Sequence, residues 1–323
     1  MEQLALGWVL LASTLFGTAA TGSRRDLNTI KEVAMDMVLS SFDDQYQGCS
    51  RMMEKELEEL NRTEFANPDY AEGWRGAVTE WRNRWGRAAR PQVLRQEHAV
   101  AVLAYTAERG LYKQFNTAVR EGGRSREHYL QSFPFKTLHF LLTKALHTLR
   151  EAQGHSCHRV YRGIKGTRFT AQLRQTVRFG QFTSASLQKK VAESFGQDTF
   201  FFLDTCYSVP IKNFSFYPSE DEVLIPPYEV FKVTNFTRDR DGNFIHLHSQ
   251  TALSTYNCEF VKGKGNTSVW GAWGAWGAPG AWGARGGGEL AFRPGLPCAS
   301  LHAPSCSPLG FAVGALCGTA RAG

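Results

Sequence analysis

The 323-residue sequence lacks the features by which several functional classes are usually recognised. It has no run of basic residues like those that bind nucleic acid. Its formal net charge of +7 therefore favours at most anionic partners such as dinucleotides or sulfated surfaces, or serves solubility. The segment 155–158 reads HSCH, but no second pair of metal ligands follows at a suitable spacing. We therefore predict neither a nucleic-acid partner nor a metal site.

A long uninterrupted apolar run is also missing. The apolar segment that begins at Leu4 is short, contains polar breaks and ends in small residues, which argues against a membrane span. This pattern predicts a secretory signal peptide over residues 1–22, although Glu2 stands where a basic residue is usual. Four N-glycosylation sequons agree with export. They begin at Asn61, Asn213, Asn235 and Asn266.

Cysteine is present in an odd number, seven, of which four lie in the body of the chain and three in its tail. The body cysteines are Cys49, Cys157, Cys206 and Cys258, and the tail cysteines are Cys298, Cys306 and Cys317. In an oxidising compartment the first four indicate two disulfides with three possible connectivities. The odd total leaves at least one thiol unpaired within the chain or joined to a partner.

Residues 23–154 carry patterns typical of helices. One helix is expected to open at Ser50, and Asn67 followed by Pro68 has the residue types favoured at an N-cap and a first helical position. Tryptophans then recur at helical spacing, which favours core packing over a stacking platform for bases. Residues 98–105 fit a helix or a strand, with helix favoured by their alanine content, and 26–39 fit either. Pro134 begins the most strongly amphipathic helix, after a loop predicted at 122–126.

Residues 155–262 read differently, as short apolar runs separated by Gly, Pro, Asn and Asp, with one helix expected at 186–196. The fold class is therefore α+β: a mainly helical N-terminal half packed on a C-terminal antiparallel β core of two sheets. The Gly/Ala/Trp-rich segment 263–323 is predicted to be disordered. Its apolar stretch 309–318 allows a cleaved lipid-anchor signal.

Three acidic residues stand together at Glu220, Asp221 and Glu222, directly before the short apolar run 223–225. Residues two apart in an extended segment point the same way, so Glu220 and Glu222 can share one face. Glycosyl transfer needs such a pair, one carboxylate to stabilise a sugar cation and one to take the proton of the incoming nucleophile. The alternative is a solvated acidic turn. A glycosidase pair is less favoured, because its acids usually come from separate elements.

Three segments in order give this acidic pair a context: YRG at 161–163, GQFTSASL at 180–187 and SEDEVLIPP at 219–227. Together they resemble the arginine-specific mono-ADP-ribosyltransferases of the vertebrate secreted and cell-surface type. That family is related to bacterial toxins with an Arg, Ser-x-Ser, Glu-x-Glu signature. The segments FDDQY, AYT, FPFKTLHF and YNCEF fit the same family, and the resemblance covers about residues 24–262. It implies the ADP-ribosyltransferase fold.

The resemblance also implies roles for the residues that bind NAD. Arg162 matches the arginine that holds the dinucleotide, since a guanidinium is a bidentate phosphate donor, although a strand-edge arginine in water is the plainer alternative. Gly163 lacks a Cβ, so a ligand can approach its backbone, which in the family grips the nicotinamide amide. Tyr105, Gln181 and Ser215 match further positions around the dinucleotide. Tyr105 fits the core equally well.

The same resemblance assigns the chemistry. Glu222 matches the catalytic glutamate, which accepts a hydrogen bond from the nicotinamide ribose and stabilises an oxocarbenium-like transition state. Glu220 matches the acid that marks arginine as acceptor. Ser184 is the serine that fixes the direction of the catalytic carboxylate. Ser186 has the residue type of an N-cap for the helix that follows.

These matches imply an enzyme that places ADP-ribose from NAD or NADP on arginine side chains of proteins and releases nicotinamide. No cofactor is expected to be permanently bound. The alternatives are an NAD glycohydrolase, which would need Glu222 but not Glu220, and a catalytically silent binding module, which would have lost Arg162, Ser184 or Glu222. The family also implies the pairings Cys49–Cys258 and Cys157–Cys206. Its partners would be extracellular or secretory-pathway proteins, with membrane attachment only through a lipid anchor.

Overall fold

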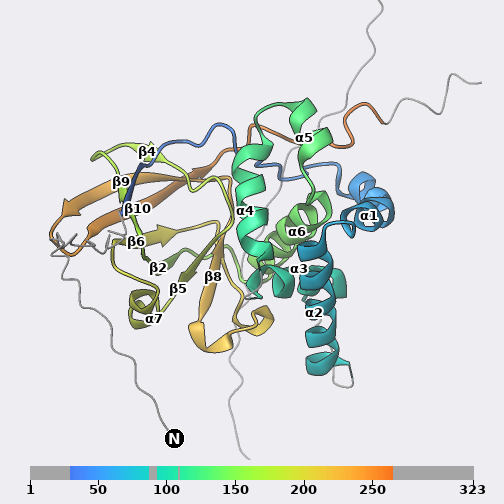
Figure 1. Ribbon diagram of the computed structural model, residues 1–323, viewed down its shortest axis with the longest axis horizontal. Coiled ribbons are helices and arrows are strands. Elements are labelled where there is room, and N and C mark those ends of the chain that lie inside the picture. Colours follow the sequence, from blue (N-terminus) through green and yellow to red (C-terminus); the bar gives the residue numbers. More distant parts are fainter. Residues whose placement is uncertain (1–29, 87–92, 108–109, 265–323) are drawn as a thin grey trace, which may run out of the picture. The chain divides into compact units, whose positions relative to one another are not determined.

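Helices from the first half of the chain lie beside a β-sheet built by the second half (Figure 1). The computed structural model describes residues 30–86, 93–107 and 110–264. The predicted signal segment, the sequon at Asn266, the tail cysteines and all but the first two residues of the predicted tail lie outside the described residues. Within the described ranges, no helix is both long and apolar enough to cross a membrane.

The helical half follows the apolar spacing of the sequence. Its helices are α1 (Ser50–Glu64), α2 (Pro68–Trp85), α3 (Gln96–Thr106), α4 (Leu111–Gly122), α5 (Arg126–Ser132) and α6 (Lys136–Ala152). The Asn67 side chain accepts from the backbone N–H of Asp69 and Tyr70, which confirms the predicted N-cap of α2. The ambiguous segment 98–105 is helical and buried all round, at the centre of the helical layer.

In this half the structure decides one segment that the sequence left open and adds one helix that was not predicted. The segment 26–39, which fitted a helix or a strand, contains strand β1 (Lys31–Ala34). Helix α5 was not predicted beyond the loop at 122–126, because seven residues are too few for an apolar period to show. Its start is nevertheless marked by Ser125, whose side chain accepts from the backbone N–H of His128.

The second half forms an eight-stranded sheet in the order β4-β9-β10-β6-β2-β5-β8-β7, while β3 pairs with β1 in a small separate sheet. Its elements are β2 (His158–Ile164), β3 (Thr167–Thr170), β4 (Thr176–Val177), β5 (Thr183–Ser186), α7 (Lys189–Ser194), β6 (Thr199–Thr205), β7 (Val209–Pro210), the 3₁₀ turns η1 (Lys212–Phe214) and η2 (Pro218–Glu220), β8 (Glu222–Ile225), β9 (Glu229–Arg238) and β10 (Asn243–Ala252). The α+β class with two sheets is therefore confirmed.

The expectation of a wholly antiparallel core is wrong at two places. Strand β10 runs parallel to β6, and β1 runs parallel to β3. Alternating apolar residues show that a segment is a half-buried strand, but they carry no information about the direction of its neighbour. The β9–β10 hairpin is antiparallel, as its short connection requires, and it places β10 beside β6 in the parallel sense.

Strands β2 and β5 meet at a single residue pair, Tyr161 with Ser186. On one side of this junction β2, β6, β10, β9 and β4 continue the sheet, and on the other side β5, β8 and β7 do. Apolar side chains of β7 and β8, such as Val209 and Leu224, pack into the same core as the helices. A second core lies within the sheet region and includes Val160, Phe201 and Ile245. The junction is thus a narrow bridge in an otherwise firmly packed fold.

Two disulfides fasten the described chain, and both pairings implied by the family are confirmed. Cys49 bonds to Cys258 across a sequence separation of 209, and Cys157 bonds to Cys206. The first bond connects the start of α1 to the segment that follows β10, so it joins the two ends of the domain.

Candidate functional site

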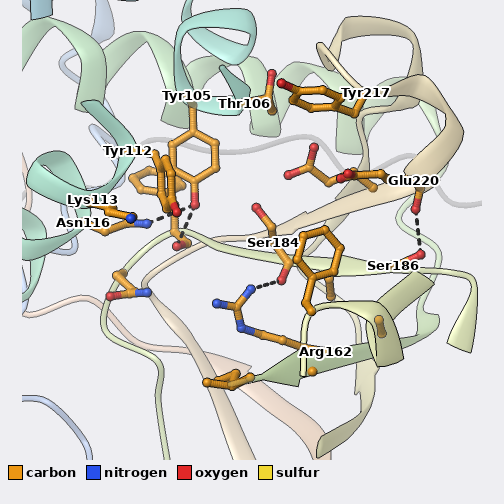
Figure 2. Close-up of a pocket in the computed structure, with 18 of the residues that line it drawn as sticks. Tyr105, Thr106, Tyr112, Lys113, Asn116, Arg162, Ser184, Ser186, Tyr217 and Glu220 are labelled. Atoms are coloured by element: carbon orange, nitrogen blue, oxygen red, sulfur yellow. Dashed lines mark hydrogen bonds between the residues drawn. The ribbon is translucent and has the colours of Figure 1, made fainter. Parts of the chain in front are cut away.

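A cleft of about 550 Å³ opens where β2, β5 and β8 come together beside α3, α4 and α7. Arg162 comes from β2, Ser184 from β5 and Glu222 from the start of β8, and all three line this cleft. Figure 2 shows Arg162 and Ser184 facing one space, with Glu220 at its rim. The structure therefore brings together three residues that lie as much as sixty positions apart in the sequence.

Arg162 is held in the cleft by its own sheet. Its guanidinium donates to the backbone carbonyl of Ser184 on the neighbouring strand β5, as the dashed line in Figure 2 marks. Burial of the guanidinium lowers the pKa of Arg162, and the nearby hydroxyls of Tyr105 and Tyr112 and the Glu222 carboxylate oppose that shift. Arg162 also lines the cleft. A buried cation in this position favours an anionic ligand.

Glu222 is the most buried acid of the cleft. It begins β8, where it pairs across the sheet with Ser186 of β5, and Ser215 donates to its Oε2 at 2.9 Å. Burial raises the pKa of Glu222, hydrogen bonds from Ser184 and Ser215 oppose the shift, and the neighbouring charge of Glu220 adds to it. The Ser184 hydroxyl therefore lies near enough to the carboxylate to influence its pKa.

Glu220 reaches the same cleft by a different geometry from the one expected. It ends the 3₁₀ turn η2, and Asp221 after it has left-handed backbone angles, so the two glutamates are not neighbours two apart in one strand. The Ser186 hydroxyl donates to the Glu220 carbonyl at 2.6 Å. We predicted from its residue type that Ser186 is the N-cap of α7. This prediction is wrong, because the helix begins after Gln188. Ser186 holds the acidic turn instead, while accepting from the Gln188 N–H.

The packing of the protein requires a glycine at position 163, whether or not a ligand is bound. A Cβ at this position would lie 2.1 Å from the carbonyl oxygen of Ala192 and 2.3 Å from that of Gly196. Helix α7 and its end therefore pack directly on the backbone of β2. The glycine lets α7 close one wall of the cleft, which Ala192 also lines.

The remaining candidates divide between wall and support. Tyr105 lines the cleft and is almost fully buried, and its hydroxyl donates to the Phe182 carbonyl at 2.9 Å, so it packs in the core at the wall of the cleft. Burial raises the pKa of Tyr105 to about 12, so it stays a neutral hydrogen-bonding group. Gln181 lines the cleft and accepts from Arg120. Ser215 stands behind Glu222 rather than in the lining.

Sequence reasoning missed the contribution of α4. Tyr112, Lys113, Asn116 and Arg120 lie on one side of this helix and line the cleft. Their spacing of three and four residues was a usable signal, since polar groups on one helical face opposite an apolar face mark a lined cavity as well as solvent. Asn116 is buried and donates to the Tyr105 hydroxyl at 3.1 Å. Lys113 and Glu220 lie on opposite sides of the view in Figure 2.

The charges of the cleft fit a dinucleotide. Its lining includes four cationic side chains, at Lys113, Arg120, Arg162 and Lys165, together with the two carboxylates of Glu220 and Glu222. Cations can neutralise a diphosphate, while buried carboxylates stabilise positive charge that develops on a sugar. Among the described residues, no group of three or more His, Cys, Asp or Glu side chains is placed to hold a metal ion.

Comparisons with known proteins agree with this arrangement. The family model described as NAD:arginine ADP-ribosyltransferase matches residues 35–255. The erythroblast NAD(P)(+)--arginine ADP-ribosyltransferase of Gallus gallus is 64% identical over 259 residues, which cover 80% of this chain and 86% of that protein. The GPI-linked NAD(P)(+)--arginine ADP-ribosyltransferase 1 of Homo sapiens is 48% identical over 279 residues, or 82% of this chain and 85% of that protein.

A solved structure gives the same result. The crystal structure of the eucaryotic mono-ADP-ribosyltransferase ART2.2 matches with a TM-score of 0.61 and 38% identity, and it covers 70% of this chain and 98% of that one. A variant of ART2.2 has also been solved in complex with NAD, and it matches equally well.

Proposed function

Because the chain belongs to the NAD:arginine ADP-ribosyltransferase family, we propose that the cleft between β2, β5 and β8 is where it transfers ADP-ribose from NAD to arginine side chains. NAD is a substrate of the reaction and not a resident cofactor. The bond from the nicotinamide nitrogen to its ribose breaks, nicotinamide leaves with the bonding electrons, and an arginine nitrogen forms the new bond to the ribose. The observation that carries this assignment is the meeting of Arg162, Ser184 and Glu222 in one cleft.

Arg162 binds the diphosphate of NAD in this proposal. Its guanidinium is buried and has one protein acceptor, the Ser184 carbonyl, so it keeps donors for two phosphate oxygens. Neutralisation by a phosphate would also remove the cost of burying this cation. Lys113, Arg120 and Lys165 supply further positive charge along the lining.

Glu222 acts where the sugar becomes positive. As nicotinamide departs, the ribose acquires oxocarbenium character, and a carboxylate that accepts from a ribose hydroxyl stabilises that charge. Ser215 and Ser184 fix the direction of the carboxylate, so it needs no reorganisation during the reaction. Its buried position strengthens the interaction relative to water.

Glu220 prepares the acceptor. A free guanidinium is a poor nucleophile because its pKa lies above about 12. A carboxylate beside it can align one nitrogen and take up its proton as the new bond forms. Glu220 lines the same cleft as Glu222, which supports assigning the two functions to one site.

The experiment compares two isosteric variants, Glu222→Gln and Glu220→Gln, by release of nicotinamide from NAD with and without agmatine as a guanidinium acceptor. We expect the Glu222 variant to lose both transfer and hydrolysis by at least about a hundredfold, since it removes an electrostatic stabiliser of the transition state. The Glu220 variant should lose transfer and keep hydrolysis. Asp204→Asn, on an exposed ion pair with Arg159, is the matched control. Nicotinamide release that agmatine leaves unchanged in the wild type would identify a glycohydrolase instead.

The chain is a cell-surface or extracellular protein. Its two disulfides require an oxidising compartment, and similar proteins include GPI-linked and ecto-enzymes. We propose that it reaches this location through the secretory pathway and modifies arginines of extracellular or secretory-pathway proteins. Labelled NAD with a mixture of such proteins, followed by mapping of the modified side chain, tests the second point.

A further inference from the structure

Asp221 stands between the two acids of the cleft, but its side chain is engaged elsewhere. Glu220 and Glu222 line the cleft and Asp221 does not. One oxygen of the Asp221 carboxylate lies 2.5 Å from Nζ of Lys212 in η1. The other accepts from the side-chain amide of Gln188, the residue before α7. One carboxylate thus ties together three segments that are separate in the sequence.

The backbone of Asp221 is equally constrained. Its φ of 44° and ψ of 50° are left-handed, a conformation that Asp and Asn tolerate better than most side chains. Its carbonyl accepts from the N–H of Leu187 at 3.1 Å, and its own N–H donates to the carbonyl of Pro218. The left-handed residue turns the chain from η2 into β8, so it determines how Glu220 is presented next to Glu222.

We propose that Asp221 is a positioning residue for transfer to arginine, which together with Lys212 and Gln188 holds Glu220 in the place that the acceptor guanidinium requires. This proposal rests on the roles given above to Glu220 and Glu222. Besides its backbone hydrogen bonds, the acidic turn is held by the Ser186 hydroxyl on the Glu220 carbonyl and by the Lys212–Asp221–Gln188 contact beside it. Loss of the Lys212–Asp221–Gln188 contact would let the turn that carries Glu220 shift. A displacement of about 1 Å can lower a rate a hundredfold.

The Lys212–Asp221–Gln188 contact should matter for transfer to arginine and not for hydrolysis. Glu222 belongs to β8, whose four residues are all buried and all pair with β5, and its carbonyl accepts from the N–H of Ile211, so it stays in place without the clamp. Of the two glutamates, hydrolysis needs only Glu222. Transfer also needs Glu220 at a set distance from the ribose. Because Gln188 precedes the helix whose Val191 and Ala192 line the cleft, the clamp sets the acceptor carboxylate relative to the wall against which NAD binds.

The test measures both reactions in Lys212→Met and Asp221→Asn. Lys212 is about half exposed, so its replacement by Met keeps the aliphatic stem and should not disturb folding. We expect the kcat/KM for agmatine to fall about tenfold in either variant while nicotinamide release without agmatine stays within about twofold. The Lys212→Arg variant should keep transfer near the wild-type rate, because arginine keeps the positive charge at this position. The double variant should be no worse than either single one, since both remove the same contact.

Two further variants separate the side chain from the backbone. Asp221→Gly keeps the left-handed conformation and loses the carboxylate, so it should match Asp221→Asn. Asp221→Ala loses both and should be worse than either. Asp204→Asn, at the exposed pair with Arg159 on another strand, is the control that should change neither reaction.

Equal loss of transfer and hydrolysis in Lys212→Met would overturn the proposal, because the contact would then support the whole site. Unchanged transfer in both Lys212→Met and Asp221→Asn would overturn it as well. Either result differs from failure of the proposed function, in which the wild type shows no agmatine-dependent reaction or Glu222→Gln keeps its activity.

Discussion

Glu222 combines two demands that oppose each other. In the proposed reaction it must be ionised to stabilise a sugar cation, yet burial and the charge of Glu220 raise its pKa. The hydroxyls of Ser184 and Ser215 reduce this conflict because they donate to the ionised form. The acid is therefore poised so that its charge is costly in the free enzyme and is compensated when positive charge appears on the substrate.

This balance predicts a pH dependence. Activity falls as pH drops through the pKa of Glu222, and a raised pKa moves this acid limb above the range of an ordinary glutamate. Glu220→Gln removes the like charge, so the acid limb of the remaining hydrolysis should move to lower pH. The profile of nicotinamide release without agmatine measures the shift. A limb that stays in place would show that Glu220 is neutral when Glu222 titrates.

A buried ion pair lies away from the cleft lining, between Arg178 and Asp43. Nη1 of Arg178 lies 2.6 Å from Oδ2 of Asp43. Arg178 also donates to the backbone carbonyls of Met37 and Leu253. Asp43 in turn accepts from the backbone of Thr255. These contacts explain why the segment FDDQY, recognised as a family feature, is kept inside the fold.

We expect Asp43→Asn to lower the free energy of unfolding by about 3 kcal/mol, because it leaves the buried guanidinium of Arg178 without its counter-charge. The same substitution at the exposed pair, Asp204→Asn, should cost less than about 1 kcal/mol. Urea unfolding of both variants provides the measurement. Similar losses in the two would mean that the buried cation is satisfied by carbonyls alone.

Some residues of the cleft could be predicted from sequence motifs, and others could not. Arg162, Ser184 and Glu222 could be located from ordered motifs, since each keeps a chemical type that the reaction needs. The function of Ser186 could not be predicted, because a serine before a helix suits an N-cap equally well and only the folded chain shows Glu220 above it. Asn116 and Arg120 were hidden for the same reason, as their partners lie on distant segments.

Among the elements, α6 has an unusual start. The residue before it, Phe135, provides no side-chain cap. Instead, the carboxylate of Glu64 at the end of α1 accepts from the backbone N–H groups of Lys136 and Thr137. One helix thus caps another across the core. Glu64 is nearly fully buried there, and burial raises its pKa to about 7 against the opposing effect of these hydrogen bonds.

The raised pKa makes the stability depend on pH. Between the ordinary value of 4.5 and about 7, the folded state holds a proton on Glu64 that the unfolded state releases. The stabilisation is therefore complete below pH 4.5 and declines as pH rises through about 7, by up to about 3 kcal/mol. Glu64→Gln should lack this decline. Unfolding free energies at about pH 5 and about pH 8 for both proteins test it, and parallel curves would mean that the helix start keeps Glu64 ionised throughout.

The elements themselves were largely predictable where one period dominated. The N-cap at Asn67 and the apolar face after Pro134 gave α2 and α6, because a helix records its buried face every third or fourth residue. The parallel pairing of β6 with β10 could not be predicted, since strand direction is decided by the path of the chain between them. The single bridge between β2 and β5, where the cleft opens, is likewise a property of the assembled sheet.

At the scale of the whole domain, contacts between the segments around Cys49 and Cys258 join the helical half to the end of the β-rich half. The helical layer begins beside Cys49 and the sheet ends beside Cys258, and the same region carries Asp44, whose carboxylate accepts from the backbone N–H groups of Cys258 and Glu259. Hydrogen bonds and the disulfide thus hold together the start of the helical layer and the segment that follows the sheet.

Removal of this bond should therefore affect stability far more than chemistry. The Cys49–Cys258 bond closes a loop across a sequence separation of 209, and the chain-entropy account gives it about 5 kcal/mol. The Cys157–Cys206 bond closes a loop across a separation of only 49 and should contribute about 4 kcal/mol. We expect paired Cys→Ser variants to lose unfolding free energy in that order, while nicotinamide release per folded molecule at low temperature stays near that of the wild type. A loss of activity in the Cys49 and Cys258 variant before any unfolding, followed by circular dichroism, would instead show that this bond also shapes the cleft.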